Sequence, residues 1–286
     1  MIPAQFEYSA PATLSEALAA LSQNPEAKAL AGGHSLLPAM KLRLSTPPVL
    51  VDLRKIADLR GVSANGGGWR IGAMTTHDQV ANNSNLKAYG ALIDAASIIG
   101  DAQVRNRGTI GGSLAHADPA ADLPAVVLVL EATINATGSS GARSIPIDDF
   151  FTSLFETTLG EGEILTSIDL PAPAANTGSA YAKFANPASG YAMVGVAARV
   201  TLSGGNAQNV RVALTGAADH AVRLSSVESA LEGKPITAES IAAACEQAGA
   251  GLDLLGDIHA SAEYRAAMVK VYARRALSKA LERAQG

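Results

Sequence analysis

The stretch ALAGGHSLLPAMKLRL, residues 29–44, sets two glycines, a histidine and a serine between two apolar runs. Gly32 and Gly33 can adopt backbone angles closed to other residues, and they let the main chain approach a ligand closely at a cost in conformational entropy. An anion held by successive backbone N–H groups would compensate for that cost, with His34 and Ser35 as further donors. A tight turn between two strands is the alternative. On the dipeptide alone the turn is favoured, because short glycine motifs often match by chance.

The residues around this stretch predict a small α/β unit. Thr13 followed by Glu16 forms a capping box, and apolar residues at helical spacing then predict a helix from about residue 14 to 23. AKALAG and PPVLVDL look like short buried strands on either side of the glycine loop. The first fifty residues therefore predict the order strand, helix, strand, loop, strand.

A second mixed unit follows. Gly66–Gly68 predicts a hairpin turn, the strand WRIGAM comes after it, and residues 86–100 have the period of a buried helix. Residues 107–124, RGTIGGSLAHADPAADLP, form a second glycine-rich loop. The apolar, β-branched run at 125–137 predicts a strand covered on both faces, although Leu123–Val127 fits the end of a helix equally well.

The last third of the chain predicts a hairpin and helices. LPAPAANTGSAY, residues 170–181, has the composition of an interdomain linker. Residues 194–202 alternate with period two, Ser203–Asn206 turns the chain, and VRVALTG returns as an antiparallel partner. Three helices are predicted after the hairpin, one opened by Ser225 with Glu228 and stopping at Gly233, one after Thr237, and one over residues 261–284.

Composition narrows the classes of protein. The 286 residues carry a formal charge of −4, which offers no overall attraction to nucleic acid or to an anionic membrane. The single Cys245 excludes an intrachain disulfide and an iron–sulfur cluster held by four cysteines of this chain. The N-terminus lacks the basic and apolar regions of a leader, and no apolar run is long enough to span a membrane. We expect a cytoplasmic, soluble protein.

The second glycine-rich loop again joins paired glycines to hydroxyl groups, and His116, Asp118 and Asp122 follow it. Acid–base catalysis by these three residues is one interpretation. The favoured one makes Asp118 a turn initiator and Asp122 a helix cap or an acceptor for a ligand hydroxyl. The sequence spacing of His34, His116 and Asp118 matches no metal-binding motif, so it does not support a metal site. We therefore assign no catalytic and no metal-binding residue.

Two diglycine loops on separate subdomains fit a long ligand whose charged middle lies in the crevice between them. A dinucleotide pyrophosphate has that shape. The G-x-G-x-x-G fingerprint and the G-x-x-x-x-G-K-[ST] phosphate loop are both absent, which disfavours a Rossmann domain.

The segments AGGHSLLP and QVRNRGTIGGS, residues 31–38 and 103–113, resemble the two FAD-binding segments in the medium, flavoprotein subunit of molybdenum hydroxylases. Within that family the sequence looks most like the medium subunits of aerobic carbon monoxide dehydrogenases, over nearly its whole length. The resemblance implies an α+β fold. Residues 1–174 would be an FAD-binding module of the vanillyl-alcohol-oxidase (PCMH) type, with two α/β subdomains of about 1–54 and 55–174. Residues 175–286 would be a C-terminal domain with a three-stranded antiparallel sheet and helices.

The resemblance also implies which residues contact FAD. The pyrophosphate would lie between the first loop, which is Ala31, Gly32, Gly33, His34 and Ser35, and the second, which is Thr109, Ile110, Gly111, Gly112 and Ser113. Asp122 would hold a ribose or ribityl hydroxyl, Ile99 and Leu165 would pack near the ring system and the adenine, and Lys183 and Tyr191 would lie beside the isoalloxazine. The alternatives are a half-buried strand aromatic for Tyr191 and a solvated strand residue for Lys183.

As in the family, a large partner would bind the molybdenum cofactor and oxidise the substrate, and a small partner would carry two [2Fe–2S] clusters. The complex would be a dimer of heterotrimers. The FAD of this chain would pass electrons to an external acceptor, and a quinone is preferred to NAD as that acceptor. Lys183 would stabilise negative charge on the reduced isoalloxazine ring. Carbon monoxide is the first choice of substrate over aldehydes, purines and N-heterocycles. The rival functions are a self-sufficient FAD-dependent oxidoreductase and a non-redox nucleotide-binding protein.

Overall fold

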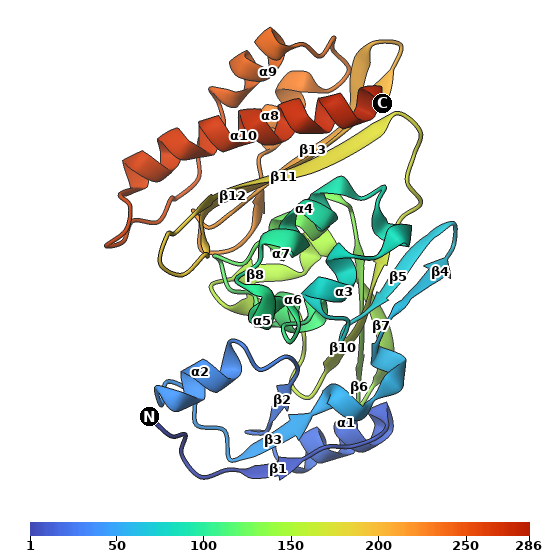
Figure 1. Ribbon diagram of the computed structural model, residues 1–286, viewed down its shortest axis with the longest axis vertical. Coiled ribbons are helices and arrows are strands. Elements are labelled where there is room, and N and C mark those ends of the chain that lie inside the picture. The colour runs from blue at the N-terminus through green and yellow to red at the C-terminus, as the bar shows by residue number, and fades with distance from the viewer.

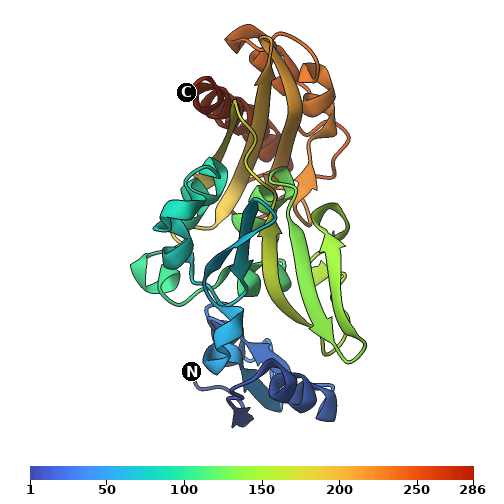
Figure 2. The ribbon, with the colours of Figure 1, turned by 90° about the vertical axis from the view of Figure 1, so that its right-hand side faces the viewer.

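Three sheets of three or more strands organise the chain, one in each of three parts stacked along the long axis (Figure 1). The computed structural model describes residues 1–286. We call the parts the N-terminal lobe (residues 1–55), the middle part (residues 62–170) and the C-terminal part (residues 177–286). Figure 2 shows the same stacking from the side, with the N-terminal lobe at one end and the C-terminal part at the other. No helix has the length and apolar character needed to cross a membrane.

The N-terminal lobe is a parallel sheet covered by one helix, as the sequence predicts. Helix α1 (Leu14–Gln23) begins at the capping box of Thr13 and Glu16. An unpredicted short helix, α2 (Leu36–Lys41), follows the first glycine stretch. In spatial order the strands are β1 (Glu7–Ser9), β3 (Val49–Asp52) and β2 (Lys28–Leu30).

The middle part is an antiparallel sheet with helices packed on one face, as Figure 1 shows, and the strands lie side by side in Figure 2. Its strands in spatial order are β4 (Val62–Asn65), β5 (Gly68–Gly72), β10 (Ile164–Leu170), β6 (Thr133–Gly138) and β7 (Gly141–Pro146). Its helices are α3 (His77–Ala81), α4 (Gly90–Ile98), α5 (Ala102–Arg105), α6 (Ile110–His116) and α7 (Leu123–Val129). A small ribbon of β8 (Phe151–Ser153) and β9 (Glu156–Thr157) lies between β7 and β10 in the chain.

The apolar run at 125–137 is helical in its first half, so the prediction of one continuous strand is wrong there. Helix α7 starts after Asp122 with Pro124 in its first turn, and strand β6 begins only at Thr133. Every residue of α7 is buried. A helix enclosed on all sides has no polar face, so periodicity cannot separate it from a buried strand.

The C-terminal part contains the predicted hairpin and long helix. Its strands are β11 (Thr177–Ala185), β12 (Ala192–Ser203), β13 (Asn206–Thr215) and, as a two-residue edge strand beyond the expected three, β14 (Val222–Arg223). Its helices are α8 (Ser225–Leu231), α9 (Ala238–Cys245) and α10 (Ala262–Gln285). Thr237 caps α9 as predicted. Strand β11 starts at Thr177, so only residues 171–176 of the predicted linker are irregular.

Ser225 does not cap α8 with its side chain, contrary to the sequence prediction. The N-cap position belongs to Leu224, and no side chain bonds the first turn. Glu228 instead accepts a hydrogen bond from the Val212 amide at 2.8 Å and pairs with Arg223 at 2.7 Å. The carboxylate is therefore used to fix the helix to the sheet.

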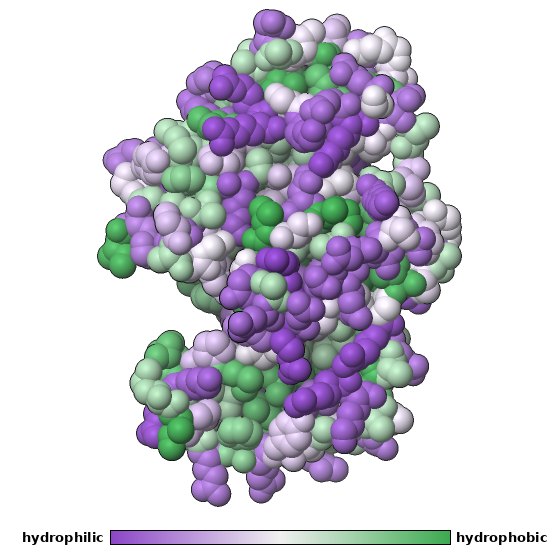
Figure 3. Space-filling model, in the orientation of Figure 1, coloured by the Kyte–Doolittle hydropathy of each residue, from purple (hydrophilic) through white to green (hydrophobic).

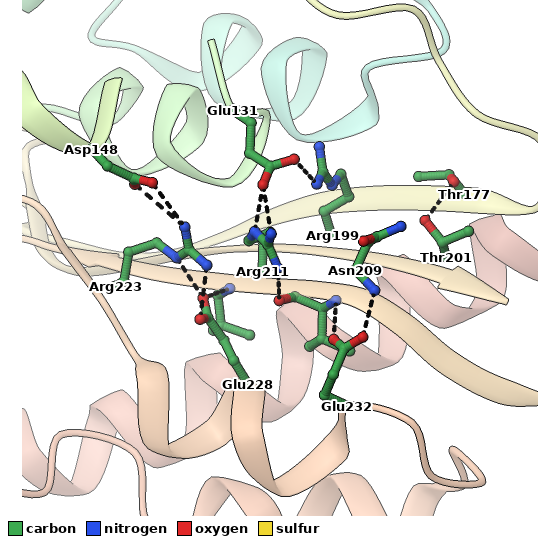
Figure 4. Close-up of polar contacts among 12 residues, drawn as sticks. Glu131, Asp148, Thr177, Arg199, Thr201, Asn209, Arg211, Arg223, Glu228 and Glu232 are labelled. Atoms are coloured by element: carbon green, nitrogen blue, oxygen red, sulfur yellow. Dashed lines mark hydrogen bonds and ion pairs between the residues drawn. The ribbon is translucent and has the colours of Figure 1, made fainter. Parts of the chain in front are cut away.

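The C-terminal sheet lies between two helical layers. Helix α10 packs on one face, and α4 and α7 of the middle part pack on the other. Polar contacts reinforce this interface, as Figure 4 shows: Glu131 accepts from both Arg199 and Arg211, and Asp148 pairs with Arg223. The middle and C-terminal parts are thereby joined by both apolar packing and ion pairs.

Candidate functional site

The two glycine segments, residues 31–35 and 109–113, meet at the crevice between the N-terminal lobe and the middle part. A Cβ atom added to Gly32 would lie 2.3 Å from the Arg107 carbonyl oxygen and 2.7 Å from the Cα of Gly108. A Cβ atom on Gly112 would lie 3.1 Å from the Ala31 side chain. Any larger residue would push the segments apart. Figure 3 shows the outline of the molecule narrowing between the lobe and the middle part.

The first glycine segment presents unused donors. The backbone N–H groups of residues 32–36 donate no hydrogen bond within the chain, and Gly33 adopts the left-handed conformation with φ of +78°. His34 Nδ1 lies 3.0 Å from the Gly32 carbonyl oxygen, and the His34 ring is exposed. A row of free amides is what an anion-binding nest requires, so this arrangement favours the anion site over a simple turn.

The second glycine segment is the start of a helix, and the prediction of a loop there is wrong. Thr109 is the N-cap of α6, and the amide of Gly112 donates to its hydroxyl at 3.2 Å. The amides of Ile110 and Gly111 donate to the carbonyls of Thr75 and Ala73, at 3.0 and 2.9 Å. A Cβ atom on Gly111 would lie 2.4 Å from the Ala73 side chain, so the glycine is needed for this close packing.

Hydrogen bonds from the C-terminal sheet hold the loop after α6, residues 117–122, which we call the clamped loop. The Thr215 hydroxyl lies 2.8 Å from the Pro119 carbonyl oxygen and 2.7 Å from that of Ala121. Asp118 accepts from the Ala120 amide at 2.9 Å, as a turn residue does. His116 is exposed and packs against the Phe155 ring, with centroids 5.2 Å apart. No hydrogen bond or ion pair joins His116 to either aspartate, so the geometry does not support acid–base chemistry by these three.

A buried polar cluster holds Asp122. Its carboxylate accepts from the Tyr181 hydroxyl at 2.6 Å and from the Lys183 ammonium at 2.9 Å. The side chains of Lys183 and Asp122 are only 4% and 6% exposed. The solvated alternative for Lys183 is therefore wrong. Burial raises the pKa of the Asp122 carboxyl, against the opposing effects of Lys183 and the Tyr181 hydroxyl.

Sequence reasoning missed Tyr181, whose hydroxyl completes this cluster. Residues two apart on a strand share a face, so Tyr181 and Lys183 on β11 point the same way. The alternation of side chains along the strand could therefore have identified Tyr181 beside Lys183. A Cβ atom on Gly195 of β12 would lie 2.1 Å from the Tyr181 hydroxyl oxygen. Burial, together with the Asp122 charge, raises the Tyr181 pKa well above its usual value, which keeps the hydroxyl a donor.

Tyr191 lies where the first glycine segment faces the clamped loop, and it is 43% exposed. Burial of its ring and the charge of Asp118 raise the pKa of its hydroxyl, and the neighbouring Ser35 side chain opposes them. Tyr191 thus links the N-terminal lobe, the middle part and the C-terminal part.

Ile99 and Leu165 lie in different surroundings. Ile99 ends α4 and is partly buried, and its carbonyl oxygen accepts from Arg105 at 3.1 Å. The Lys183 ammonium lies 3.4 Å from the adjoining Ile98 carbonyl, which ties this turn to the Asp122 cluster. Leu165 is 5% exposed and packs within the apolar core of the middle part.

His77, the first residue of α3, is a second feature that no motif marked. It is 5% exposed, and its amide donates to the Gly108 carbonyl at 3.0 Å, beside the glycine segments. Burial, together with the nearby His34, lowers the pKa of His77 to about 4. Its Nδ1 atom is enclosed and has no hydrogen-bond partner.

The remaining candidates do not form a site. No group of three or more His, Cys, Asp or Glu side chains could hold a metal ion. A cavity of about 670 Å³ is lined by residues of α4, β11 and β12, among others, and contains none of the predicted contacts. Four of its charged side chains are already paired, Arg283 with Asp94 at 2.7 Å and Arg199 with Glu131.

Comparison with known proteins agrees with this geometry. Residues 4–173 match the family described as the FAD binding domain in molybdopterin dehydrogenase, and residues 179–280 match the C-terminal domain of the carbon monoxide dehydrogenase flavoprotein. The matched domain makes FAD the cofactor of this chain.

Relatives match along the whole length. The chain is 41% identical to the carbon monoxide dehydrogenase medium chain of Hydrogenophaga pseudoflava, over 99% of each chain. It is 35% identical to the 6-hydroxypseudooxynicotine dehydrogenase complex subunit alpha of Paenarthrobacter nicotinovorans, over 100% of this chain and 97% of that one. A chain in a solved carbon monoxide dehydrogenase structure from Hydrogenophaga pseudoflava superposes with a TM-score of 0.95 at 42% identity, over 99% of each chain. The chain therefore belongs to the family of FAD-binding flavoprotein subunits of carbon monoxide dehydrogenase-like molybdenum hydroxylases, which are oxidoreductases.

Proposed function

We propose that this chain takes electrons from iron–sulfur clusters of a partner subunit onto FAD and passes them to an external acceptor. The observation that carries the proposal is the row of free amides at residues 32–36, set against the close-packed second glycine segment. When bound, FAD couples one-electron donors to a two-electron acceptor. The chain supplies position and electrostatics.

The residues divide this work between them. The nest formed by Ala31, Gly32, Gly33, His34 and Ser35 holds the pyrophosphate. In the second segment the amides of Ile110, Gly111, Gly112 and Ser113 are already bonded, so the segment contributes its shape and the hydroxyls of Thr109 and Ser113. Ile99 and Leu165 supply the apolar surroundings of the ring system and the adenine.

Lys183 and Tyr191 lie beside the isoalloxazine in this proposal, and Asp122 accepts a ribose or ribityl hydroxyl. Each oxygen of the Asp122 carboxylate already takes one donor, from Tyr181 or from Lys183, and each has a second lone pair for that hydroxyl. Because Asp122 is ion-paired to Lys183, it partly neutralises the positive charge that Lys183 offers to the reduced ring.

We also propose that residues 1–174 are the FAD-binding domain, in subdomains of about 1–54 and 55–174, and that residues 175–286 are a second domain. The partners are a large subunit with the molybdenum cofactor and a small subunit with two [2Fe–2S] clusters, in a cytoplasmic dimer of heterotrimers. Carbon monoxide is the proposed substrate and a quinone the proposed acceptor. The similarity to a carbon monoxide dehydrogenase medium chain supports carbon monoxide as the substrate. The similarity to the 6-hydroxypseudooxynicotine dehydrogenase subunit supports the alternative, an N-heterocycle.

The decisive experiment uses the complex purified from its native host. The flavin is released by denaturation and identified, and the same sample is assayed for molybdenum and iron. We expect FAD together with both metals, and turnover with carbon monoxide and a quinone. FAD without either metal would support the self-sufficient oxidoreductase, and a sample with no flavin would contradict the proposal.

A further inference from the structure

His77 is the only buried histidine of the chain, and neither of its ring nitrogens has a hydrogen-bond partner within it. Nδ1 is fully enclosed and unpartnered. Nε2 makes no hydrogen bond either, and it is not among the enclosed atoms. A buried imidazole without any partner is uncommon, because polar groups removed from water nearly always find one. Nδ1 is closed to any ligand, so a partner from outside the chain can reach only Nε2.

The Nε2 edge of the ring faces the point where the two glycine segments meet. A Cβ atom on Gly108 would lie 2.9 Å from His77 Nε2 and 2.8 Å from Cδ2. The Cα of the same Gly108 would be 2.7 Å from a Cβ atom on Gly32. The His77 ring therefore lies against Gly108, which in turn lies against Gly32 of the first segment, where the amides of residues 32–36 are unbonded.

The backbone fixes the imidazole in this position. The His77 amide bonds the Gly108 carbonyl, and Thr76 and Thr109 form a β-bridge immediately beside it. Thr76 and Gln79 form a capping box that anchors the start of α3. The main chain at His77 is therefore fixed to the second glycine segment, and the side chain is 5% exposed among its neighbours.

The ring is neutral at physiological pH. With a pKa of about 4, lowered by burial and by His34, it carries one N–H and one lone pair. The accessible Nε2 is the atom that can reach a ligand. A neutral donor at this place complements a negatively charged oxygen, because hydrogen bonds to ionised acceptors are the stronger ones.

We propose that His77 donates a hydrogen bond from Nε2 to a phosphate oxygen of the FAD pyrophosphate, between the two glycine segments. This inference rests on the proposed function, because it takes FAD as the ligand of the crevice. It adds to the FAD site a residue outside both glycine segments.

The test is a titration of FAD into the deflavinated full-length chain, followed by quenching of flavin fluorescence, for the wild type and three variants. His77→Leu fills the volume without a donor. His77→Gln places an amide nitrogen near the position of Nε2, and His77→Asn places one near Nδ1. Thermal unfolding of each variant without FAD shows that it is folded.

We expect His77→Leu to weaken FAD binding by about ten- to a hundredfold, the effect of removing a hydrogen bond to a charged acceptor. His77→Gln should recover most of that loss, and His77→Asn should recover little. Should His77→Leu fail to fold, the difference between the Gln and Asn variants still decides the question.

Unchanged FAD affinity in His77→Leu, or recovery by Asn in place of Gln, would overturn the inference while leaving the proposed function intact. A wild-type chain that takes up no FAD would overturn both. The two failures are thus distinguished by the wild-type titration alone.

Discussion

The two glycine segments share a diglycine and a neighbouring hydroxyl residue, but their backbone amides are used in opposite ways. The amides of residues 32–36 have no acceptor within the chain, whereas those of residues 110–113 are all bonded. The same dipeptide therefore serves two purposes. In the first segment it frees donors for a ligand, and in the second it allows one backbone to pack on another.

The difference follows from where each segment lies in the fold. The first leaves strand β2 at the edge of a small lobe, where no acceptor of the chain bonds its amides. The second enters the middle part between α3 and the end of β5, where the carbonyls of Ala73 and Thr75 take its N–H groups. Substitutions in the second region should therefore reduce stability, and substitutions in the first should reduce FAD affinity.

The largest effect is expected from Asp122→Asn, in the buried cluster that follows the second segment. The change leaves the Lys183 charge buried without its partner, which costs about 3–5 kcal/mol. Denaturant unfolding of the FAD-free chain measures the loss. The double variant Asp122→Asn/Lys183→Met is the control and should regain much of it, and a loss in the single variant below about 1 kcal/mol would show that the cluster is not structurally coupled.

The next effect is a dependence of stability on pH through His77, which borders both segments. Its folded pKa of about 4 lies below the ordinary value of 6.5. Above pH 6.5 both states are neutral, but between pH 6.5 and 4 only the unfolded chain takes up the proton, so stability falls with pH. The loss should reach about 3 kcal/mol near pH 4.

Unfolding of the wild type and of His77→Gln, each without FAD, from pH 7 to pH 4.5 isolates this contribution, because carboxylates titrate equally in both proteins. We expect the stability difference between the two to shrink or reverse in favour of His77→Gln as the pH falls. Parallel stability curves would contradict the prediction.

Gly111→Ala tests the close-packed segment directly. Its Cβ would lie 2.4 Å from the Ala73 side chain, an overpacking that costs about 1–3 kcal/mol. We expect a melting temperature lower by several degrees, with the FAD affinity of the folded protein changed little. Gly160→Ala, whose Cβ would meet only the flexible Glu163 side chain at 3.3 Å, is the matched control and should melt like the wild type.

We expect Gly33→Ala to have the smallest effect on stability and a clear effect on FAD binding. Alanine disfavours the φ of +78° by about 1–2 kcal/mol. Because the amides of this segment are unbonded, the variant without FAD can change its backbone conformation and avoid the strain. The free-energy cost then appears on binding, because FAD requires the native backbone geometry. FAD affinity should fall about tenfold.

The control for Gly33→Ala is Gly61→Ala, which has a φ of +91°, open space around its Cα and no place in the glycine segments. It should leave FAD affinity unchanged. If Gly33→Ala lowered the melting temperature as much as Gly111→Ala and left FAD binding intact, the contrast between the two segments would be reversed.

Local patterns predicted most elements correctly, and each miss has its own physical cause. A capping box marked α1, Thr237 marked the start of α9, and period-two alternation marked the hairpin of β12 and β13. At helix α7 the sequence allowed either a strand or the end of a helix over Leu123–Val127, because a segment buried on all sides shows no periodicity, and the structure has the helix. Helix α6 was taken for a loop because two glycines lower helix propensity, while packing against Ala73 requires them.

The sequence by itself determined the elements, the two glycine motifs and, through its resemblance to a known family, the cofactor. Tertiary structure alone decided which amides remain free, because that depends on which carbonyls the fold brings to each segment. It also decided that Tyr181, Lys183 and Asp122 form one buried cluster and that His77 reaches the crevice. These contacts join residues far apart in the chain, and local propensity and spacing contain no information about such distances.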